Sequence, residues 1–208
     1  NLGEKYSFFV LDAGLSGSTQ TAIFGEKYPE RFINCGIAEQ NMISIAAGIA
    51  AAGKVPFAST FAMFAAGRAY EQVRNGIGYP HLNVKIGATH QAIEDIALMR
   101  VIPGMTVICP ADDIEARAAV HAAYETPGPV YLRFGRLPVP VINDRPDYKF
   151  EIGKGVVLKE GKDLTVISTG LCVPETLEAA YQLEKEGISV KVINIHTIKP
   201  LDEELVIK

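Results

Sequence analysis

Three polar side chains of this 208-residue chain stand where an apolar segment of the sequence begins or ends. Glu39 starts the segment AEQNMISIAAGIAAAG (38–53), His90 lies between a strand-like and a helix-like segment, and Arg136 follows a strand-like segment and a glycine. A carboxylate can exchange a proton with a ligand, a histidine at such a corner lies where parallel sheets bind ligands, and an arginine can hold an anion. These side chains are therefore the first candidates for a binding or catalytic site.

Glu39 has an ordinary interpretation and a functional one. An acid in the first turn of a helix is stabilised by the helix dipole, by about 0.3–1 kcal/mol. The segment after Glu39, however, is rich in alanine and glycine and leaves little side chain on any face. Such a helix lets another backbone or a rigid ring come close, and a carboxylate enclosed there needs a specific partner.

The other candidates also have two interpretations each. Phe61 and Phe64 follow a predicted strand with helical spacing, so they are either core residues or a platform for a flat heterocycle. His90 is either a structural histidine or one that faces a ligand, and Arg136 is either a solvated loop residue or an anion clamp. The residues alone leave these alternatives open.

Strand-like and helix-like segments alternate through most of the chain, and this order predicts how the candidates are positioned. Unbroken apolar strands that alternate with helices are typical of a parallel sheet covered by helices on both faces. The sequence therefore predicts an α/β fold. The expected strands are 7–13, 31–37, 54–60, 82–88, 105–111 and 128–134, and the expected helices are 38–53, 61–79, 90–102 and 112–125.

The alternation stops in the proline-rich stretch 135–155, which holds few helix-forming residues. A β-β-α-β pattern follows, and its helix has an amphipathic stripe near Leu177. We predict a first domain over 1–136, a linker over 137–151 and a second α/β domain over 152–208. Because one crossover and a fragment cannot cover a sheet, we expect this second domain to be incomplete.

The composition excludes several classes of protein. A net charge of −4 and a pI of about 5.6 argue against a sequence-independent nucleic-acid binder, which needs a basic face. No apolar run reaches the roughly 18 residues of a membrane span. Three cysteines (Cys35, Cys109 and Cys172) without CxxC or zinc spacing indicate a reducing cytoplasm, and without an initial Met the chain is not expected to begin at its natural N-terminus.

Several motifs follow one another over nearly the whole chain: LSGSTQTAIF, FINCGIAEQNMISIAAGIAAAGKVPFASTFAMF, NVKI, GATHQAIEDIALMR, MTVICPAD, GPVYLRFGR and INIHTIKPLDEE. In this order they resemble the C-terminal half of transketolase, specifically the C-terminal subunit of two-subunit transketolases, and GIAEQNM is the most specific of them. The resemblance implies a thiamine diphosphate-binding fold of the pyrimidine-binding type, followed by part of the transketolase C-terminal domain.

The resemblance implies cofactor-binding roles for three residues. Glu39 matches the acid that hydrogen-bonds pyrimidine N1′ of thiamine diphosphate and so makes the cofactor reactive. Phe61 and Phe64 match the aromatic residues against which the pyrimidine packs. A semi-buried carboxylate has a raised pKa in general, which suits it to sharing a proton with a ring nitrogen.

The resemblance also implies a substrate site. His90 matches a histidine that faces the hydroxyls of the sugar substrate and joins Glu39 as a catalytic residue. Ser18 and Arg136 match residues that contact the substrate phosphate, and an arginine with a hydroxyl is chemically suited to that task.

The chain departs from the family pattern at two places. Gly14 stands where the family has an acid, so one carboxylate is missing from the expected surroundings of the cofactor. Ile86 runs directly to Gly87, where the family carries a longer loop with another histidine and an acidic turn. We expect that this loop and a C-terminal tail belong to the natural protein.

The chain contains no GDG motif with a downstream Asn, the metal-diphosphate signature of this cofactor class. The resemblance therefore implies that no metal ligand lies on this chain. Mg²⁺ or Ca²⁺ would be held by an N-terminal transketolase subunit that carries GDG, and the chain would form a homodimer through its pyrimidine-binding domain.

The implied activity is the transfer of a two-carbon ketol unit between sugar phosphates, as in the pentose phosphate pathway. Alternatives with the same fold are the β subunit of a 2-oxo-acid dehydrogenase and a 1-deoxyxylulose-5-phosphate synthase-like enzyme, and the THQ and FGR motifs favour transketolase. A non-catalytic paralogue is an alternative of another class, which Gly14 and the short loop keep open.

Overall fold

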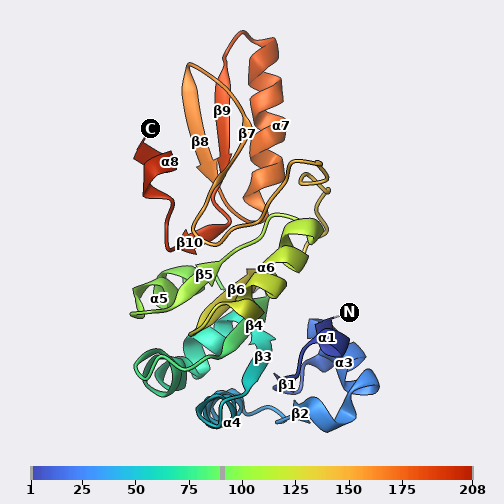
Figure 1. The fold of residues 1–208 in the computed structure, drawn as a ribbon. Helices are drawn as coiled ribbons and strands as arrows, with labels where there is room; N and C mark the ends of the chain where they lie inside the picture. The colour runs from blue at the N-terminus through green and yellow to red at the C-terminus, as the bar shows by residue number, and fades with distance from the viewer. Residues whose placement is uncertain (1, 90–91, 208) are drawn as a thin grey trace. The chain divides into compact units, whose positions relative to one another are not determined.

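The structure is a computed structural model that describes residues 2–89 and 92–207 (Figure 1). The chain divides into two compact units. The first contains Asn1–Val107 and Ala123–Arg133, and the second contains Ile108–Ala122 and Phe134–Lys208. The strand β5, the helix α6 and the strand β6 each contain residues of both units.

The first unit is built on parallel strands, as the alternation of the sequence predicted. The strands follow the order β5-β6-β4-β3-β1-β2 in the sheet. The elements are α1 (Leu2–Lys5), β1 (Phe8–Asp12), α2 (Ser16–Thr19), α3 (Thr21–Lys27), η1 (Pro29–Arg31), β2 (Phe32–Asn34), α4 (Glu39–Ala51), β3 (Val55–Phe61), η2 (Phe64–Arg68), η3 (Gln72–Gly78), β4 (Lys85–Thr89), α5 (Asp95–Val101), β5 (Thr106–Ile108), α6 (Asp113–Glu125) and β6 (Val130–Phe134).

The register of these strands brings their carboxyl ends to one edge. Asp12 at the end of β1 lies opposite Asn34 of β2 and Ser59 of β3. Phe61 at the end of β3 lies opposite Thr89 of β4. Loops that follow the carboxyl ends of parallel strands are the usual place for ligand sites. The α/β expectation is thus confirmed, and the sheet gathers the candidate residues that follow β1, β2 and β3.

The helix α4 (Glu39–Ala51) matches the predicted small-residue helix. Its buried side chains include Met42, Ile43, Ala46 and Ala50, and α4 packs against β3. Because Ala46 and Ala50 have no side chain beyond Cβ, the helix axis can come close to the sheet.

The segment 61–79 differs from the regular helix that the sequence predicted. It contains two π-helical turns, η2 and η3, in which Ala69 N–H donates to Phe64 O at 3.0 Å and Tyr79 N–H donates to Arg74 O at 2.8 Å. These bonds span five residues, so the turns are wider than those of an α-helix. The wider turn of η2 ends at Arg68, whose side chain pairs with Glu39.

The helix α5 begins at Asp95, five residues later than predicted. Asp95 is buried, and its Oδ2 accepts hydrogen bonds from Tyr131 Oη at 2.7 Å and Arg133 Nε at 2.8 Å. Arg133 also donates to Ala92 O at 3.2 Å. The start of α5 is therefore held against β6 by a buried ion pair.

Lys85, the first residue of β4, is fully buried. Its ammonium donates to Asn83 Oδ1 at 2.6 Å and to the carbonyl oxygens of Thr126 and Gly128 at 2.7 Å each. Burial lowers the pKa of Lys85 to about 7. The three acceptors match the three ammonium protons and hold the loop between α6 and β6 to the start of β4.

The second unit contains a small sheet of order β7-β9-β8, in which β8 runs parallel to β9 and β7 runs antiparallel to it. The helix α7 packs on this sheet (Figure 1), and Leu177, Ala180 and Leu183 contact Val190 and Val192. The predicted β-β-α-β order is confirmed, but its last strand is divided. The elements are β7 (Val156–Lys159), β8 (Leu164–Ser168), α7 (Cys172–Lys185), β9 (Val190–Asn194), β10 (Thr197–Lys199) and α8 (Glu203–Ile207).

Residues 135–155 form no helix or strand, yet buried acids of α6 hold them in place. Asp112 caps α6 by accepting from Glu115 N–H at 2.8 Å, and its other oxygen accepts from the N–H groups of Ile142 and Asn143 at 2.8 Å each. Glu115 accepts from Tyr148 Oη at 2.8 Å, and burial raises the pKa of Glu115. These bonds satisfy backbone groups that have no strand partner.

His196 lies between β9 and β10 and is fully buried. Its ring stacks on Phe150 with a centroid distance of 4.3 Å, and its Nδ1 lies 3.0 Å from Thr197 Oγ1. The buried Nε2 has no hydrogen-bond partner among the described residues. Burial lowers the pKa of His196 to about 4, so the ring is neutral at pH 7.

We expect His196 to make the fold sensitive to acid. Because its pKa is about 4 in the folded state and roughly 6.5 in the unfolded chain, the unfolded state binds the proton first as the pH falls. The contribution of His196 is complete above about pH 6.5 and is lost between about pH 6.5 and 4. Between pH 7 and pH 5 the free energy of unfolding should fall by about 2 kcal/mol more in the wild type than in His196→Phe. Denaturant titrations at both pH values measure this difference.

His121→Phe is the matched control, because His121 is exposed on α6 in the folded state as it is in the unfolded chain. It should follow the wild type between the two pH values. An equal pH dependence of the wild type and His196→Phe would contradict the prediction.

Candidate active site

The carboxyl edge of the sheet in the first unit carries a buried acid, an arginine and two phenylalanines. Glu39 is the first residue of α4, and its side chain is 1% exposed. Its Oε2 accepts a hydrogen bond from Arg68 Nη1 at 2.8 Å. The enclosed carboxylate therefore has the charged partner that burial requires.

Arg68 links Glu39 to the aromatic pair. Its guanidinium lies over the Phe64 ring, 4.5 Å from the centroid. The rings of Phe64 and Phe61 are nearly parallel, with an interplanar angle of 16° and a centroid distance of 5.8 Å. The structure thus brings together the three residues that the resemblance assigns to the cofactor, and Arg68 makes the connection.

Arg68 was not among the residues that the sequence predicted. Its signal was present, since a lone cation in the apolar segment FAMFAAGRAY is well placed to pair with an acid on a neighbouring helix. The contact joins residues 29 positions apart. Finding it from the sequence requires knowing that β3 lies beside β1 and that η2 widens.

The carboxylate and the two aromatic rings have the chemistry that the pyrimidine end of thiamine diphosphate requires. An aminopyrimidine is flat and carries ring nitrogens, so it needs an aromatic surface and a carboxylate that can hydrogen-bond. Among the described residues, Glu39 could offer the carboxylate, and Phe61 and Phe64 the aromatic surface.

A second buried acid, Asp12, organises the loop after β1. One carboxylate oxygen accepts from Leu15 N–H, and the other accepts from Thr19 Oγ1 at 2.7 Å and Thr21 Oγ1 at 2.9 Å. Asp12 is fully buried and was also missed from the sequence. As the last residue of an apolar strand followed by hydroxyl residues, it had a recognisable signal. Its bonds fix the segment that contains Ser18.

Gly14 has a structural reason to be glycine. Its φ is +77°, and an added Cβ would lie 3.4 Å from the carbonyl carbon of Gly36 and 3.5 Å from Ile37. The loop after β1 therefore packs closely against the loop that leads into α4. An acid at position 14 would need a left-handed backbone that L-residues rarely adopt.

Two of the three predicted substrate residues lie in the described part of the chain. Ser18 is exposed in α2, within the loop that Asp12 holds. Arg136 is exposed just after β6 and belongs to the second unit. His90 lies outside the described residues. Ile86 and Gly87 are consecutive residues inside β4.

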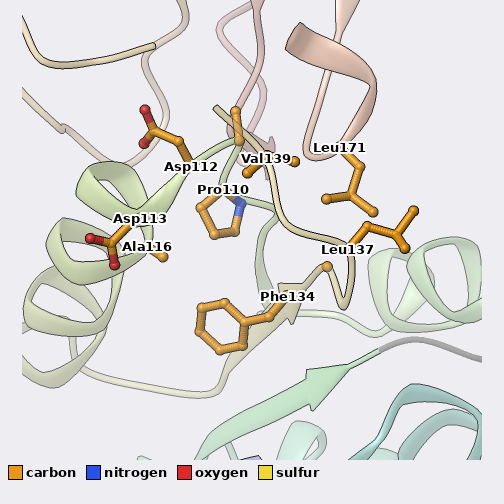
Figure 2. A pocket seen from close by; sticks show the side chains of 10 residues that line it. Pro110, Asp112, Asp113, Ala116, Phe134, Leu137, Val139 and Leu171 are labelled. Carbon is orange, nitrogen blue, oxygen red and sulfur yellow. The ribbon is translucent and has the colours of Figure 1, made fainter. Parts of the chain in front are cut away.

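The second unit contains a pocket of about 180 Å³ (Figure 2). The carboxylate of Asp112 in its wall is already occupied by backbone N–H groups, and Asp113 pairs with Arg117 at 3.1 Å. The pocket therefore offers mainly apolar surface. Its lining residues are Pro110, Ala111, Asp112, Asp113, Ala116, Phe134, Gly135, Leu137, Val139 and Leu171.

Residues 2–89 and 92–207 lack two further kinds of feature. Within these ranges no group of three or more His, Cys, Asp or Glu side chains is arranged to hold a metal ion. Within the same ranges no helix has the length and apolar character needed to cross a membrane.

Comparison with known families identifies two domains. The transketolase pyrimidine-binding domain matches residues 2–141, and the transketolase C-terminal domain matches residues 153–208. Together these matches cover nearly the whole chain.

Individual relatives agree with these domains. The chain is 50% identical to a putative transketolase C-terminal section from Methanocaldococcus jannaschii, over 221 aligned positions that cover 100% of this chain and 70% of the relative. It is 42% identical to the 6-deoxy-6-sulfo-D-fructose transketolase subunit SqwH of Clostridium sp. (strain MSTE9), covering 96% of this chain and 65% of the relative. The M. jannaschii alignment is longer than this chain, so that relative carries residues that have no counterpart here.

A solved structure described as a split-gene transketolase, inactive β4 tetramer, is similar to the chain with a TM-score of 0.93 and 54% identity. The similarity covers 99% of this chain and 71% of that one. The chain therefore spans between 65% and 71% of the length of these three proteins.

We expect Asp12→Asn to destabilise the first unit and loosen the loop that contains Ser18. An Asn side chain could keep its oxygen on Leu15 N–H, but its NH₂ would then face the hydroxyls of Thr19 and Thr21, which would have to become acceptors. These bonds would also lose the carboxylate charge that strengthens them. The free energy of unfolding should fall by about 1–3 kcal/mol, and hydrogen exchange at Leu15 N–H should accelerate.

Asp113→Asn makes the same change at an exposed carboxylate that pairs with Arg117. It should alter stability by no more than about 0.5 kcal/mol. Equal effects of the two substitutions would show that the Asp12 bonds contribute little.

Proposed function

This chain belongs to the transketolase family, and we propose that it is the subunit of a thiamine diphosphate-dependent transketolase that binds the pyrimidine end of the cofactor. The proposed reaction is the transfer of a two-carbon ketol unit between sugar phosphates. The matches to both transketolase domains support the family, and the site geometry supports the cofactor role.

One observation carries the proposal. Glu39 is 1% exposed at the start of α4, and Arg68 links it to the nearly parallel rings of Phe61 and Phe64. A first-turn acid that only stabilised its helix would be solvated. An enclosed carboxylate that one flat cation links to an aromatic surface is instead suited to a flat heterocycle with a basic nitrogen.

When bound, thiamine diphosphate supplies the carbon nucleophile of ketol transfer. Glu39 would hold a proton at the pyrimidine nitrogen N1′, and its burial would keep water from competing for that proton. Phe61 and Phe64 would fix the plane of the pyrimidine. The chain would thus control the proton at N1′ and orient the pyrimidine ring.

For the substrate, we assign Ser18 and Arg136 to its terminal anion and His90 to its hydroxyls. Arginine with a hydroxyl is a suitable pair of donors for a phosphate. The Clostridium relative is named for a sulfonated sugar, whose terminal group is also a tetrahedral anion. The same donors could therefore serve different sugars within the family.

The diphosphate end of the cofactor would be held by a second subunit. This chain has no GDG motif, so Mg²⁺ or Ca²⁺ and the diphosphate would be bound by an N-terminal transketolase subunit that carries it. The exposed residues of α4 include Ser44, Gly48 and Ala51, which leave room for the same helix of a second copy. The β4 tetramer of the similar split-gene transketolase is described as inactive, as expected if activity needs another subunit.

Glu39→Gln should abolish ketol transfer while leaving the fold intact. An amide has nearly the same shape but cannot share a proton with N1′, and the loss of such a proton transfer costs about 10²–10⁴-fold in rate. The assay is ketol transfer between sugar phosphates with the complementing subunit present. Glu71→Gln, at an exposed position, is the control and should keep the wild-type rate. A rate for Glu39→Gln above about a tenth of the wild type would be incompatible with this role.

The chain alone should bind thiamine diphosphate weakly, even with Mg²⁺. It offers one end of the site, and the diphosphate charge would have no metal to neutralise it. Calorimetric titration of the chain should show dissociation constants well above the micromolar range. Addition of a GDG-bearing subunit should restore tight binding and turnover together. Micromolar or tighter binding by the chain alone would show that the site is divided differently.

A further inference from the structure

Arg68 makes two contacts at once, one with an acid and one with an aromatic ring. Its Nη1 donates to Glu39 Oε2 at 2.8 Å, and its guanidinium lies 4.5 Å from the centroid of Phe64. Glu39 and Phe64 are the residues to which the proposed function assigns the pyrimidine ring. The guanidinium therefore contacts the same two groups that the pyrimidine ring would contact.

A guanidinium also resembles a protonated aminopyrimidine in its chemistry. Both are flat and positively charged, both donate N–H groups in their plane, and both stack on aromatic rings. A site that binds one through a carboxylate and a phenyl ring can bind the other in the same way. The two groups would then compete for one carboxylate.

We propose that Arg68 is a displaceable internal partner of Glu39, whose guanidinium takes the place of the aminopyrimidine until thiamine diphosphate binds. This inference rests on the proposed function, because it assumes that Glu39 and Phe64 receive the pyrimidine.

The two partners differ in how freely they can move. The Glu39 side chain is 1% exposed and begins a helix of thirteen residues, whereas the Arg68 side chain is 45% exposed at the end of the π-helical turn η2. Arg68 can therefore rotate into solvent and regain water as its partner. Glu39 cannot leave, so the exchange replaces one cationic partner of a fixed carboxylate by another.

This exchange has a thermodynamic consequence. Breaking the Glu39–Arg68 pair costs free energy during cofactor binding, and that cost lowers the affinity. A variant without the guanidinium leaves Glu39 unpaired in the free protein, while the cofactor-bound state loses nothing. Such a variant should therefore bind the cofactor more tightly and be less stable without it.

The first test is calorimetric titration of thiamine diphosphate with Mg²⁺ into the complex of this chain with its GDG-bearing subunit. Arg68→Met should lower the dissociation constant about tenfold. Arg74→Met is the matched control, because Arg74 is exposed on η3 and bonds Asn75, and it should bind like the wild type. Weaker or unchanged binding by Arg68→Met would overturn the inference, since Arg68 would then support the bound cofactor or play no part.

The second test needs no cofactor. A double-mutant cycle on the unfolding of the chain alone compares Glu39→Gln, Arg68→Met and the double variant. Arg68→Met should destabilise the wild-type background more than the Glu39→Gln background. Additive effects would overturn the pair in solution. If Arg68→Met does not fold, Arg68→Gln replaces it in both tests, because it also removes the cation that pairs with Glu39.

The two tests separate this inference from the proposed function. A wild-type complex that binds the cofactor, with Arg68→Met no tighter, overturns only the inference. A wild-type complex that does not bind thiamine diphosphate overturns the proposed function and the inference with it, whatever the double-mutant cycle shows.

Discussion

A carboxylate enclosed in protein must find a cation or several donors, and in the first unit this requirement joins α4 to the segment after β3. Glu39 is held at the start of α4 by the helix and by the close packing of small residues on the sheet. Its partner has to come from a neighbouring segment, and Arg68 at the end of η2 is that partner. The parallel order of β1, β2 and β3 brings the two segments together at one edge.

The same requirement recurs at three other strand or helix boundaries that carry a buried acid. Asp12 gathers the donors of the loop after β1, Asp95 holds β6 to the start of α5, and Asp112 binds the chain at Ile142 and Asn143. In each case one residue satisfies groups that regular secondary structure leaves open. The loops at the proposed site are ordered by buried acids as well as by apolar packing.

The elements were predictable where local pattern determines them. The apolar runs of β1, β3 and β6 and the small-residue helix α4 are bounded by glycine, proline or polar residues, so their periodicity was visible in the sequence. The π-helical turns were not, because a turn wider by one residue has no separate signature in the order of apolar residues.

Local sequence pattern also could not predict the partners of the buried acids. Glu39 and Arg68 are 29 residues apart, and Glu115 and Tyr148 are 33 residues apart. Such contacts depend on register and packing, which single segments do not encode. Glu39, Phe61 and Phe64 could be named in advance because the family motif marks them, whereas Arg68 and Asp12 required the folded chain.

Lys85 shows what the enclosure of a charged group means for chemical reactivity. Its ammonium uses all three protons on acceptors inside the fold, and its pKa of about 7 is far below that of an ordinary lysine. An amine with such a pKa can lose its proton near neutral pH, but only while it stays buried. While the loop between α6 and β6 stays closed, Lys85 is shielded from acylating reagents that modify exposed lysines. Because burial is what lowers this pKa, an opening of the loop would return Lys85 to water and so to the protonated form of an ordinary lysine.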